Sequence, residues 1–289
     1  MILIVGCGFL GSYLLEHISE HTDEKIVVTT CKSERPSLRG IYEHLKCDIT
    51  DKNDLRNLSE KCKGERLTVF YFAACHNVDY VYEHPEKAGE INIAGLENFF
   101  DIMPRFEKFF FASTDCVYGE GKKLSENSVL NPVNEYGIQK MKAEKIVVSK
   151  GFTVLRYPFM LGPSLIEKPH FFDTICSKLR EGECVEMIDG MFRSVISYSQ
   201  AAKLTFRLSL LEDLPQIINV CSDNAISKYE TACVLAERIN AEKRKVKRIS
   251  EKDGEKFFKD RRASCTAMDN ALLKSLLKTE KIVWEEELS

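Results

Sequence analysis

Tyr136 and Lys140 are the residues of this sequence whose types and spacing point most directly to chemistry. They lie four positions apart in a segment with helical character, and residues four apart share a helix face. A free phenol has a pKa of about 10 and holds its proton tightly near neutral pH. A nearby ammonium stabilises the phenolate and lowers that pKa. The pair therefore predicts a tyrosine that acts as general acid or base, although the same spacing alone is more often a surface pair.

A hydroxyl pair precedes this segment. The apolar run at residues 108–112 ends in Ser113-Thr114, followed by Asp115-Cys116. The carboxyl end of a strand is where a doubly wound sheet presents its ligands. A hydroxyl placed there can hydrogen-bond a substrate carbonyl or alkoxide beside the tyrosine. The alternative is a hydroxyl-rich turn that closes a strand.

A glycine-rich turn begins the chain. The apolar run at residues 2–5 enters Gly6-Cys7-Gly8-Phe9-Leu10-Gly11, and a helical pattern follows at once. The first glycine permits a tight turn, the second lets the backbone approach a pyrophosphate, and the third allows close packing of helix on strand. The helix N-terminus adds N–H donors. This context predicts a dinucleotide site rather than a plain strand-to-helix turn, with Gly6, Gly8, Phe9, Leu10 and Gly11 in contact with the cofactor.

The second strand predicts which dinucleotide is bound. NAD-binding proteins usually carry a carboxylate at its end, bonded to the ribose 2′-hydroxyl. Residues 28–35 have no carboxylate at the strand end, while Lys32 and Arg35 could meet a 2′-phosphate. NADP(H) is therefore favoured and NAD(H) stays open. The alternative is that both cations are solvated loop residues.

Strands and helices alternate through the first half of the chain. Apolar, β-rich runs at residues 2–5, 25–30, 67–72 and 108–112 alternate with helical patterns at 9–18, 51–62 and 87–103. This predicts an α/β fold, a doubly wound parallel Rossmann sheet with a smaller C-terminal α/β substrate lobe. We expect residues 1–160 to form the cofactor-binding core with the catalytic residues. Residues 161–289 should form mainly the substrate lobe, with some segments returning to the core.

Composition excludes several function classes. The 289 residues carry 41 basic and 44 acidic side chains, a net charge of −3, so no basic excess indicates nucleic acid or an anionic membrane. No apolar run reaches the roughly 20 residues of a membrane span, and no charged segment marks a signal peptide. The eleven cysteines have no paired spacing, which indicates reduced thiols of a cytoplasmic protein and no metal site.

Together these motifs resemble the extended short-chain dehydrogenase/reductase superfamily over nearly the whole chain. In that family the hydroxyl residue three positions before the valine of Val117-Tyr118-Gly119 is catalytic, which selects Thr114 beside Tyr136 and Lys140. The resemblance implies further cofactor contacts. Asp48-Ile49 resembles the pair at adenine, Ala73-Ala74 a strand end along the cofactor, Asn92 a helix asparagine, and Tyr157 part of the segment passing the nicotinamide.

Several segments resemble the dTDP-4-dehydrorhamnose reductase group more narrowly: residues 77–92, 113–118 and 262–270. Arg193 takes the place where relatives often hold a nucleotide-sugar diphosphate, and Asp115 and Cys116 are placed with it at the substrate. Two departures stand out. The glycine loop is one residue shorter than usual, and Cys116 stands where the family's 4,6-dehydratases carry the glutamate used for water elimination.

The resemblance implies an NADP(H)-dependent oxidoreductase that reduces a 4-keto group of a nucleotide-activated sugar. Two alternatives stay open: a nucleotide-sugar 4-epimerase with tightly bound NAD, and a non-catalytic NADP-binding regulatory subunit. The intact set of Thr114, Tyr136 and Lys140 speaks against the second. A homodimer is common among the relatives.

Overall fold

The structure is a computed structural model that describes residues 1–32, 37–103 and 105–287. Its largest feature is a parallel sheet of seven strands in the order β11-β7-β5-β4-β1-β2-β3. The strands are β1 (Ile2–Val5), β2 (Ile26–Thr30), β3 (Glu43–Lys46), β4 (Leu67–Tyr71), β5 (Phe106–Thr114), β7 (Thr153–Tyr157) and β11 (Ile217–Asn219). The order reverses between β1 and β4, and this switch point is where an open α/β sheet binds its ligand.

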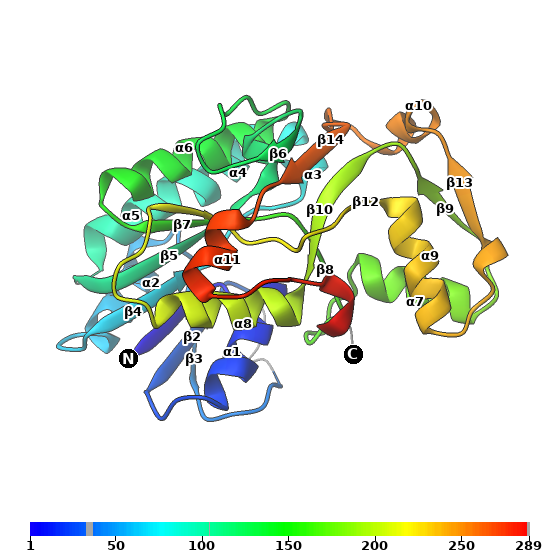
Figure 1. Cartoon of the computed structure of the whole chain (residues 1–289). Helices are drawn as coiled ribbons and strands as arrows, with labels where there is room; N and C mark the ends of the chain where they lie inside the picture. Colours follow the sequence, from blue (N-terminus) through cyan, green and yellow to red (C-terminus); the bar gives the residue numbers. More distant parts are fainter. Residues whose placement is uncertain (33–36, 104, 288–289) are drawn as a thin grey trace.

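Helices cover both faces of this sheet (Figure 1). One face packs on α1 (Phe9–Ser19), α8 (Tyr198–Ser209) and α11 (Ala271–Leu277). The opposite face packs on α2 (Lys52–Lys61), α5 (Gly95–Ile102) and α6 (Glu135–Ser149). The doubly wound α/β fold expected from the sequence is confirmed.

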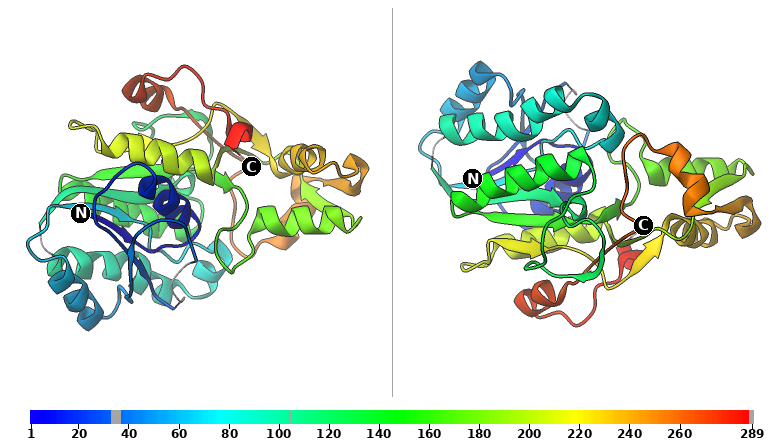
Figure 2. Two further views of the ribbon diagram at one scale, coloured as in Figure 1. Left: turned by 90° about the horizontal axis from the view of Figure 1, so that it is seen from below. Right: turned by 90° about the horizontal axis from the view of Figure 1, so that it is seen from above.

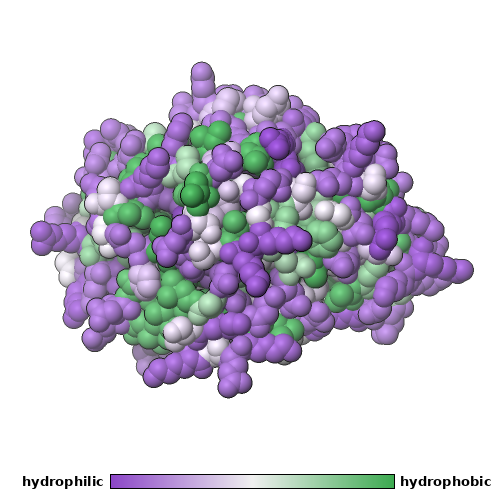
Figure 3. Space-filling model, turned by 45° about the horizontal axis from the view of Figure 1, so that its top comes forward, coloured by the Kyte–Doolittle hydropathy of each residue, from purple (hydrophilic) through white to green (hydrophobic). Residues whose placement is uncertain are grey.

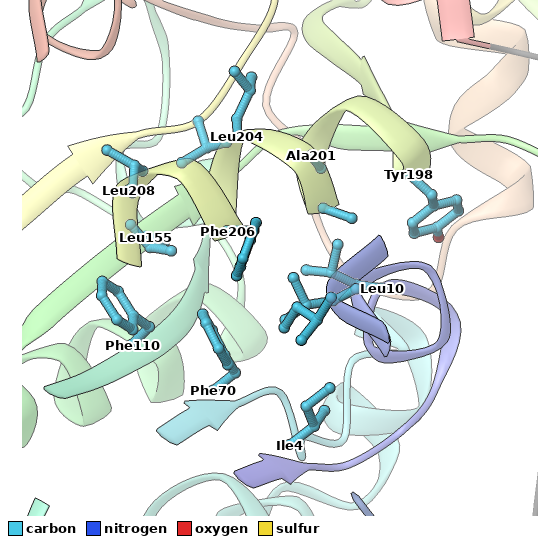
Figure 4. Close-up of a cluster of buried hydrophobic side chains, with 14 of the residues drawn as sticks. Ile4, Leu10, Phe70, Phe110, Leu155, Tyr198, Ala201, Leu204, Phe206 and Leu208 are labelled. Atoms are coloured by element: carbon cyan, nitrogen blue, oxygen red, sulfur yellow. The ribbon is translucent and has the colours of Figure 1, made fainter. Parts of the chain in front are cut away.

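Successive residues of each strand point to opposite faces, so the two hydrophobic cores alternate along the chain. Ile4, Phe70 and Phe110 belong to the α1/α8 side, whereas Leu3, Val69 and Phe109 belong to the α2/α5/α6 side. Figure 4 shows the first core, where Phe206 of α8 points towards Phe70 and Leu10, while Leu204 lies on the opposite side of the helix. Because helices cover both faces of the sheet, the central strands are nearly continuous apolar runs in the sequence.

The second half of the chain contributes to both parts of the molecule. Helix α8 and strand β11 join the main sheet's layers, while a smaller lobe lies to one side (Figures 1 and 2). A third core holds this lobe together around Trp284, which is 1% exposed. The lobe contains α7 (Phe171–Arg180), β9 (Val185–Ile188), α9 (Lys228–Arg238), β13 (Val246–Ile249), α10 (Glu251–Gly254) and η4 (Glu255–Phe257).

Small sheets connect the core to the lobe. One has the order β12-β10-β14-β6, with β8 also paired to β10, and β13 pairs with β9 in another. The connecting strands are β6 (Gly121–Leu124), β8 (Phe159–Leu161), β10 (Phe192–Ser197), β12 (Ala225–Ser227) and β14 (Cys265–Met268). Since β6 comes from the first half and β14 from the end of the chain, these pairings place distant segments beside the carboxyl ends of the main strands.

Two local features differ from the sequence reading. Strand β3 was not predicted, because its residues Glu-His-Leu-Lys are mostly polar and it forms a sheet edge. The single helix expected at 87–103 divides into α4 (Pro85–Gly89), a π-helical turn η1 (Glu90–Ala94) and α5. Such π-turns are frequently found at functional sites, and this one carries Asn92.

The surface is mainly hydrophilic on the face shown in Figure 3, with separate apolar patches. None of the helices in the described ranges is long and apolar enough to cross a membrane. All eleven cysteines are free thiols. Within the described residues no cluster of three or more histidine, cysteine or acidic side chains has the arrangement of a metal site.

The stacked pair Phe70 and Phe110 tests the packing of the α1/α8 core. Phe110 is 1% exposed and its ring centroid lies 5.3 Å from that of Phe70. We expect Phe110→Ala to lower the free energy of unfolding by about 3–5 kcal/mol, because it leaves a cavity in a rigid core. Urea denaturation measures this. Val129→Ala, at an 86% exposed position, should stay near wild type; equal stability of both variants would contradict the packing described.

Candidate active site

The glycine turn has the geometry expected of a pyrophosphate cradle. Gly6 has a φ of +88°, and a Cβ there would lie 2.6 Å from the backbone nitrogen of Ala73. A Cβ on Gly11 would lie 2.9 Å from the Gly6 carbonyl oxygen, so helix and strand touch. By contrast, no atom lies within 4 Å of where a Cβ on Gly8 would be. Gly8 begins α1 without a side-chain cap, which leaves first-turn N–H groups for an anion.

The two side chains inside this turn point in different directions. Leu10 is 6% exposed and belongs to the α1/α8 core, so only its backbone could meet a ligand. Phe9 is half-buried, and its ring lies 4.5 Å from that of His170 and 6.5 Å from that of His76. The aromatic side chains therefore bring the lobe's α7 and the loop after β4 to the glycine turn.

The residues predicted to meet the ribose and adenine of a dinucleotide follow the carboxyl ends of β2 and β3. The Asp48 carboxylate accepts hydrogen bonds from the Thr50 amide at 2.9 Å and the Thr50 hydroxyl at 2.7 Å. Ile49 is 5% exposed and packs beneath Gly95. Lys32 is exposed after β2. The fourth predicted contact, Arg35, lies outside the described residues.

Asn92 fixes the loop that follows β4. Its side-chain oxygen accepts from the Cys75 amide at 2.8 Å, and its amide donates to the Cys75 carbonyl at 3.0 Å. It also donates to Gln139 of α6 at 3.0 Å. Ala73 and Ala74 precede this clamp, and the Ala73 amide donates to the Val5 carbonyl at 2.9 Å. Asn92 thus joins the cofactor side of the sheet to the helix that carries Tyr136.

Thr114 and Tyr136 come together at the end of β5. The Thr114 side chain hydrogen-bonds the Tyr136 phenol, and both residues are less than a tenth exposed. Gly137 makes this approach possible, because a Cβ there would lie 2.4 Å from the Cys116 carbonyl oxygen. Asn134 caps α6 by accepting from the Gly137 amide at 2.8 Å. Two of the three residues predicted to be catalytic, Thr114 and Tyr136, are therefore in contact.

The electrostatics of Tyr136 differ from the prediction that Lys140 lowers its pKa. Burial raises the pKa of the Tyr136 phenol well above its ordinary value, and the neighbouring Cys116 and Asp115 raise it further. Only the hydrogen bond with Thr114 acts in the opposite direction. The sequence could not show how completely the phenol is removed from water. In this environment Tyr136 holds its proton, the state that a general acid requires.

Lys140 lies one helical turn further, in an apolar setting. Its ammonium nitrogen lies 3.9 Å from the centroid of the Phe111 ring, and the residue is 2% exposed. Burial lowers the pKa of Lys140 to about 7, although Glu144, the next residue along this helix face, opposes the shift. The lysine is therefore placed to change charge near neutral pH.

Tyr157 does not present its side chain to the site. It is 2% exposed, belongs to the α1/α8 core, and its hydroxyl lies 2.6 Å from that of Thr205 on α8. The sequence reading assigned it to the cofactor because its segment passes the active site. Any contact there has to come from the backbone.

A buried ion pair that the sequence reading missed lies behind the catalytic groups. Arg156 of β7 donates to both carboxylate oxygens of Glu144 on α6, at 3.0 and 2.6 Å. Glu144 also accepts from Ser113, the neighbour of Thr114. Arg156 continues to the Tyr118 hydroxyl at 2.8 Å, and Tyr118 donates to Asn219 of β11 at 2.7 Å. The signal available in the sequence was a glutamate one turn after Lys140.

Asp115 connects the catalytic groups to the lobe. This residue is 2% exposed and accepts hydrogen bonds from Thr114 at 3.1 Å and from Thr266 of β14. Its carboxylate forms a salt bridge at 3.2 Å with Arg193 of β10. Arg193 also lies 3.7 Å from the Cys116 sulfur. Burial and Asp115 raise the pKa of the Cys116 thiol, so this residue keeps its proton and supplies no carboxylate-like base.

A pocket opens beside Cys116 and Arg193, between the core and the lobe. Its walls are otherwise mostly apolar, but two further cations reach it, Lys228 and Arg262. Arg262 forms a salt bridge at 2.8 Å with Asp79, which lies in the first turn of α3 (Val78–Glu83) on the core. The residues that line the pocket are Val78, Cys116, Phe159, Ile188, Met191, Arg193, Ile226, Lys228, Phe258 and Arg262.

The resemblance predicts Arg193 at this place and includes Arg262 only as part of the segment 262–270. Lys228 was not predicted from the sequence. A local signal for Lys228 existed. It is the first residue of α9, after the Ser227 cap, and a lysine is unfavourable at the positive end of a helix. A residue that violates a local preference often marks a functional site.

Comparisons with known proteins show which family and which folds the chain resembles. The family model described as "NAD dependent epimerase/dehydratase family" matches residues 2–198. A UDP-glucose 4-epimerase of Lactobacillus helveticus is 28% identical over 176 residues, which are 57% of this chain and 52% of that protein. The chain spans about half the length of the first curated relatives it matches.

Solved structures match over nearly the whole chain. A hypothetical dTDP-4-dehydrorhamnose reductase from Sulfolobus tokodaii has a TM-score of 0.80 at 23% identity, with 98% of this chain and 97% of that chain covered. A UDP-glucuronic acid 4-epimerase from Bacillus cereus, in complex with UDP-glucuronic acid and NAD, has a TM-score of 0.81 at 18% identity, covering 98% and 94%. At these identities the matches establish the fold alone.

The depressed pKa of Lys140 predicts a specific pH dependence of stability. Above about pH 7 the folded protein has lost this proton, whereas the unfolded chain keeps it until about pH 10. Because the unfolded state then binds more protons, a rise in pH from 7 to 9 stabilises the fold through this group, by up to about 1.4 kcal/mol per pH unit. We therefore expect the unfolding free energy of wild type to rise, relative to that of Lys140→Met, as the pH goes from 7 to 9.

Urea denaturation at several pH values measures this difference. Lys142→Met, an exposed lysine on the same helix, controls for the loss of a lysine as such. A difference between wild type and Lys140→Met that does not change from pH 7 to 9 would contradict the buried position of the ammonium.

Proposed function

Because the chain belongs to the NAD-dependent epimerase/dehydratase family, we propose that it is an oxidoreductase that reduces a keto group, at the 4-position, of a nucleotide-activated sugar. The observation that carries the proposal is the position of Asp115. One carboxylate contacts the hydroxyl of Thr114 on one side and the guanidinium of Arg193 on the other. Proton-transfer groups and cations therefore share one cleft, as a phosphate-bearing carbonyl substrate requires.

Each residue has a role that follows from its surroundings. Tyr136 keeps its proton because burial raises its pKa, so it can protonate the oxygen of a carbonyl as that oxygen gains negative charge. Thr114 contacts the phenol, and its hydroxyl, which donates to Asp115 in this structure, can turn to donate to the same oxygen. Lys140, buried behind them, supplies a positive charge when protonated and a donor for a ribose hydroxyl. Together these groups stabilise the charge that develops on the substrate oxygen.

The cofactor is proposed on the fit of the glycine turn. Gly6 and Gly11 leave no room for a Cβ, whereas Gly8 faces open space ahead of an uncapped helix. A nicotinamide dinucleotide held there supplies the hydride. Lys32 after β2 supports the form with a 2′-phosphate, NADP(H). The Asp48 carboxylate, which follows β3, lies close enough to Lys32 for the lysine to contribute, after the hydrogen bonds from Thr50, to lowering the pKa of Asp48. NAD(H) remains the alternative form.

Dehydration is not part of the proposal. Cys116 stands where elimination would require a carboxylate, and its thiol holds its proton more tightly than a free cysteine does. Position 116 therefore offers no carboxylate base, and the neighbouring Asp115 carboxylate is engaged by Thr114, Thr266 and Arg193.

Tyr136→Phe tests the assignment of the proton donor. The substitution keeps the ring and its packing but removes the hydroxyl, so we expect kcat to fall by about 10²–10⁴. Binding of the dinucleotide, followed by fluorescence titration, should change little. Tyr82→Phe, at a 53% exposed tyrosine, is the matched control. Full turnover by Tyr136→Phe would refute the role.

A nucleotide-sugar 4-epimerase is the second candidate. Curated relatives carry that name, the Lactobacillus helveticus protein among them. Epimerisation uses the same tyrosine, lysine and hydroxyl in both directions of hydride transfer. The two functions differ in the fate of the cofactor, which a reductase consumes and an epimerase retains.

Cofactor stoichiometry separates the two functions. Purified protein is incubated with 4-keto and 4-hydroxy forms of UDP-, dTDP- and GDP-sugars, each with NADPH or NADH. We expect one equivalent of reduced nicotinamide, preferentially NADPH, to be consumed per alcohol formed from a 4-keto sugar. Interconversion of 4-hydroxy epimers without net consumption, by protein that retains NAD through purification, would favour the epimerase instead.

A further inference from the structure

The three cations of the pocket differ in how they are paired. Arg193 is neutralised by Asp115 at 3.2 Å and Arg262 by Asp79 at 2.8 Å. Lys228 forms no ion pair with any residue in the described part of the chain. Of the three cations, Lys228 is therefore the one without a carboxylate partner among the described residues.

The position of Lys228 is unfavourable for a cation without a ligand. It is half-buried at the first position of α9, where the helix dipole repels positive charge. Its ammonium lies 5.7 Å from the ring centroid of Phe171 and 5.3 Å from that of Phe258. These two rings give it a modest attraction and at the same time limit its access to water.

The charged groups that face Lys228 add to this cost. Burial, then Arg193 of β10 and Arg262 of the segment before β14, lower the pKa of Lys228 to about 8, and only Asp79 of α3 opposes them. An anion in the pocket would reverse the balance, because it would attract all three cations at once. Apart from the two rings, the described residues give this ammonium little compensation for its burial, whereas a bound anion would supply it.

We propose that Lys228 is a specificity-determining residue that binds the diphosphate of a nucleoside-diphosphate sugar and selects it over ligands with a single phosphate. The inference rests on the proposed function and names the residue that recognises its substrate. Three cations from three separate elements surround one pocket, so a ligand needs several acceptor oxygens on more than one centre to reach them. A diphosphate meets that requirement, whereas one phosphate on Lys228 leaves the arginines with their carboxylates.

Ligand binding without turnover tests the inference. Isothermal titration of UDP, dTDP and GDP, with the matching monophosphates and inorganic pyrophosphate, is carried out on wild type, Lys228→Met and Lys228→Arg. We expect Lys228→Met to bind the preferred nucleoside diphosphate about tenfold more weakly or worse, a loss of about 1.4 kcal/mol. The monophosphate should lose much less, and Lys228→Arg should recover most of the affinity.

The pH dependence gives a readout that a structural role would not move. Wild-type affinity for the diphosphate should fall as the pH rises through about 8, because Lys228 loses its proton there in the absence of a ligand. In Lys228→Met that fall should be much smaller. Lys256→Met, an exposed lysine of the same lobe that lies over Phe257, is the matched control. Dinucleotide binding reports that each variant is folded.

The outcomes separate this inference from the proposed function. Equal diphosphate affinity in wild type and Lys228→Met overturns the role of Lys228 and leaves the reaction untouched. A selective loss in Lys228→Met, with no sugar nucleotide reduced by wild type, supports the role and overturns the reaction. Failure of wild type to bind any nucleoside diphosphate or pyrophosphate overturns both.

Discussion

The buried pair of Arg156 and Glu144 is the interaction on which the geometry of the active site depends. Two charges taken out of water are costly unless they meet at close range with their remaining hydrogen bonds made. Here both carboxylate oxygens accept from the guanidinium, and Ser113 donates to the carboxylate as well. Removal of either partner would leave the other charge buried and alone. The pair therefore permits very few arrangements of α6 against the sheet.

The sheet register extends this constraint across the site. Ser113 of β5 pairs with Arg156 of β7, and Arg156 pairs with Asn219 of β11. These paired residues place the ion pair beside Ser113, one position before Thr114 in β5. On α6, Tyr136 lies two turns before Glu144. Helix and strand thus hold the two hydroxyls of the proton relay together from behind, and Gly137 allows their backbones to touch. The catalytic geometry follows from parallel strands, one salt bridge and one missing side chain.

Local sequence patterns predicted the parts of the site that are made locally. The glycine turn, the capped helix with Tyr136 and Lys140, and the strand that ends in Thr114 each depend on short segments. What the sequence could not provide was the environment produced by distant segments. Lys140 lies over Phe111 and not against the phenol, and the hydroxyl of Tyr157 contacts Thr205 of α8. Lys228 reaches the pocket because β12, the strand that leads into α9, pairs with β10. These positions depend on contacts more than twenty residues apart in the chain.

The ion pairs between core and lobe connect the pocket to the residues proposed to be catalytic. Arg193 and Arg262 belong to the second half of the chain, whereas their partners Asp115 and Asp79 belong to the core. An anion that attracts Arg193 competes with Asp115, and Asp115 in turn accepts the hydrogen bond of the Thr114 hydroxyl. An Asp115 carboxylate that shares its arginine with an anion keeps more of its own negative charge and therefore accepts the Thr114 hydrogen bond more strongly. If the pocket binds a phosphate as proposed, that binding would act on Thr114 through this one carboxylate.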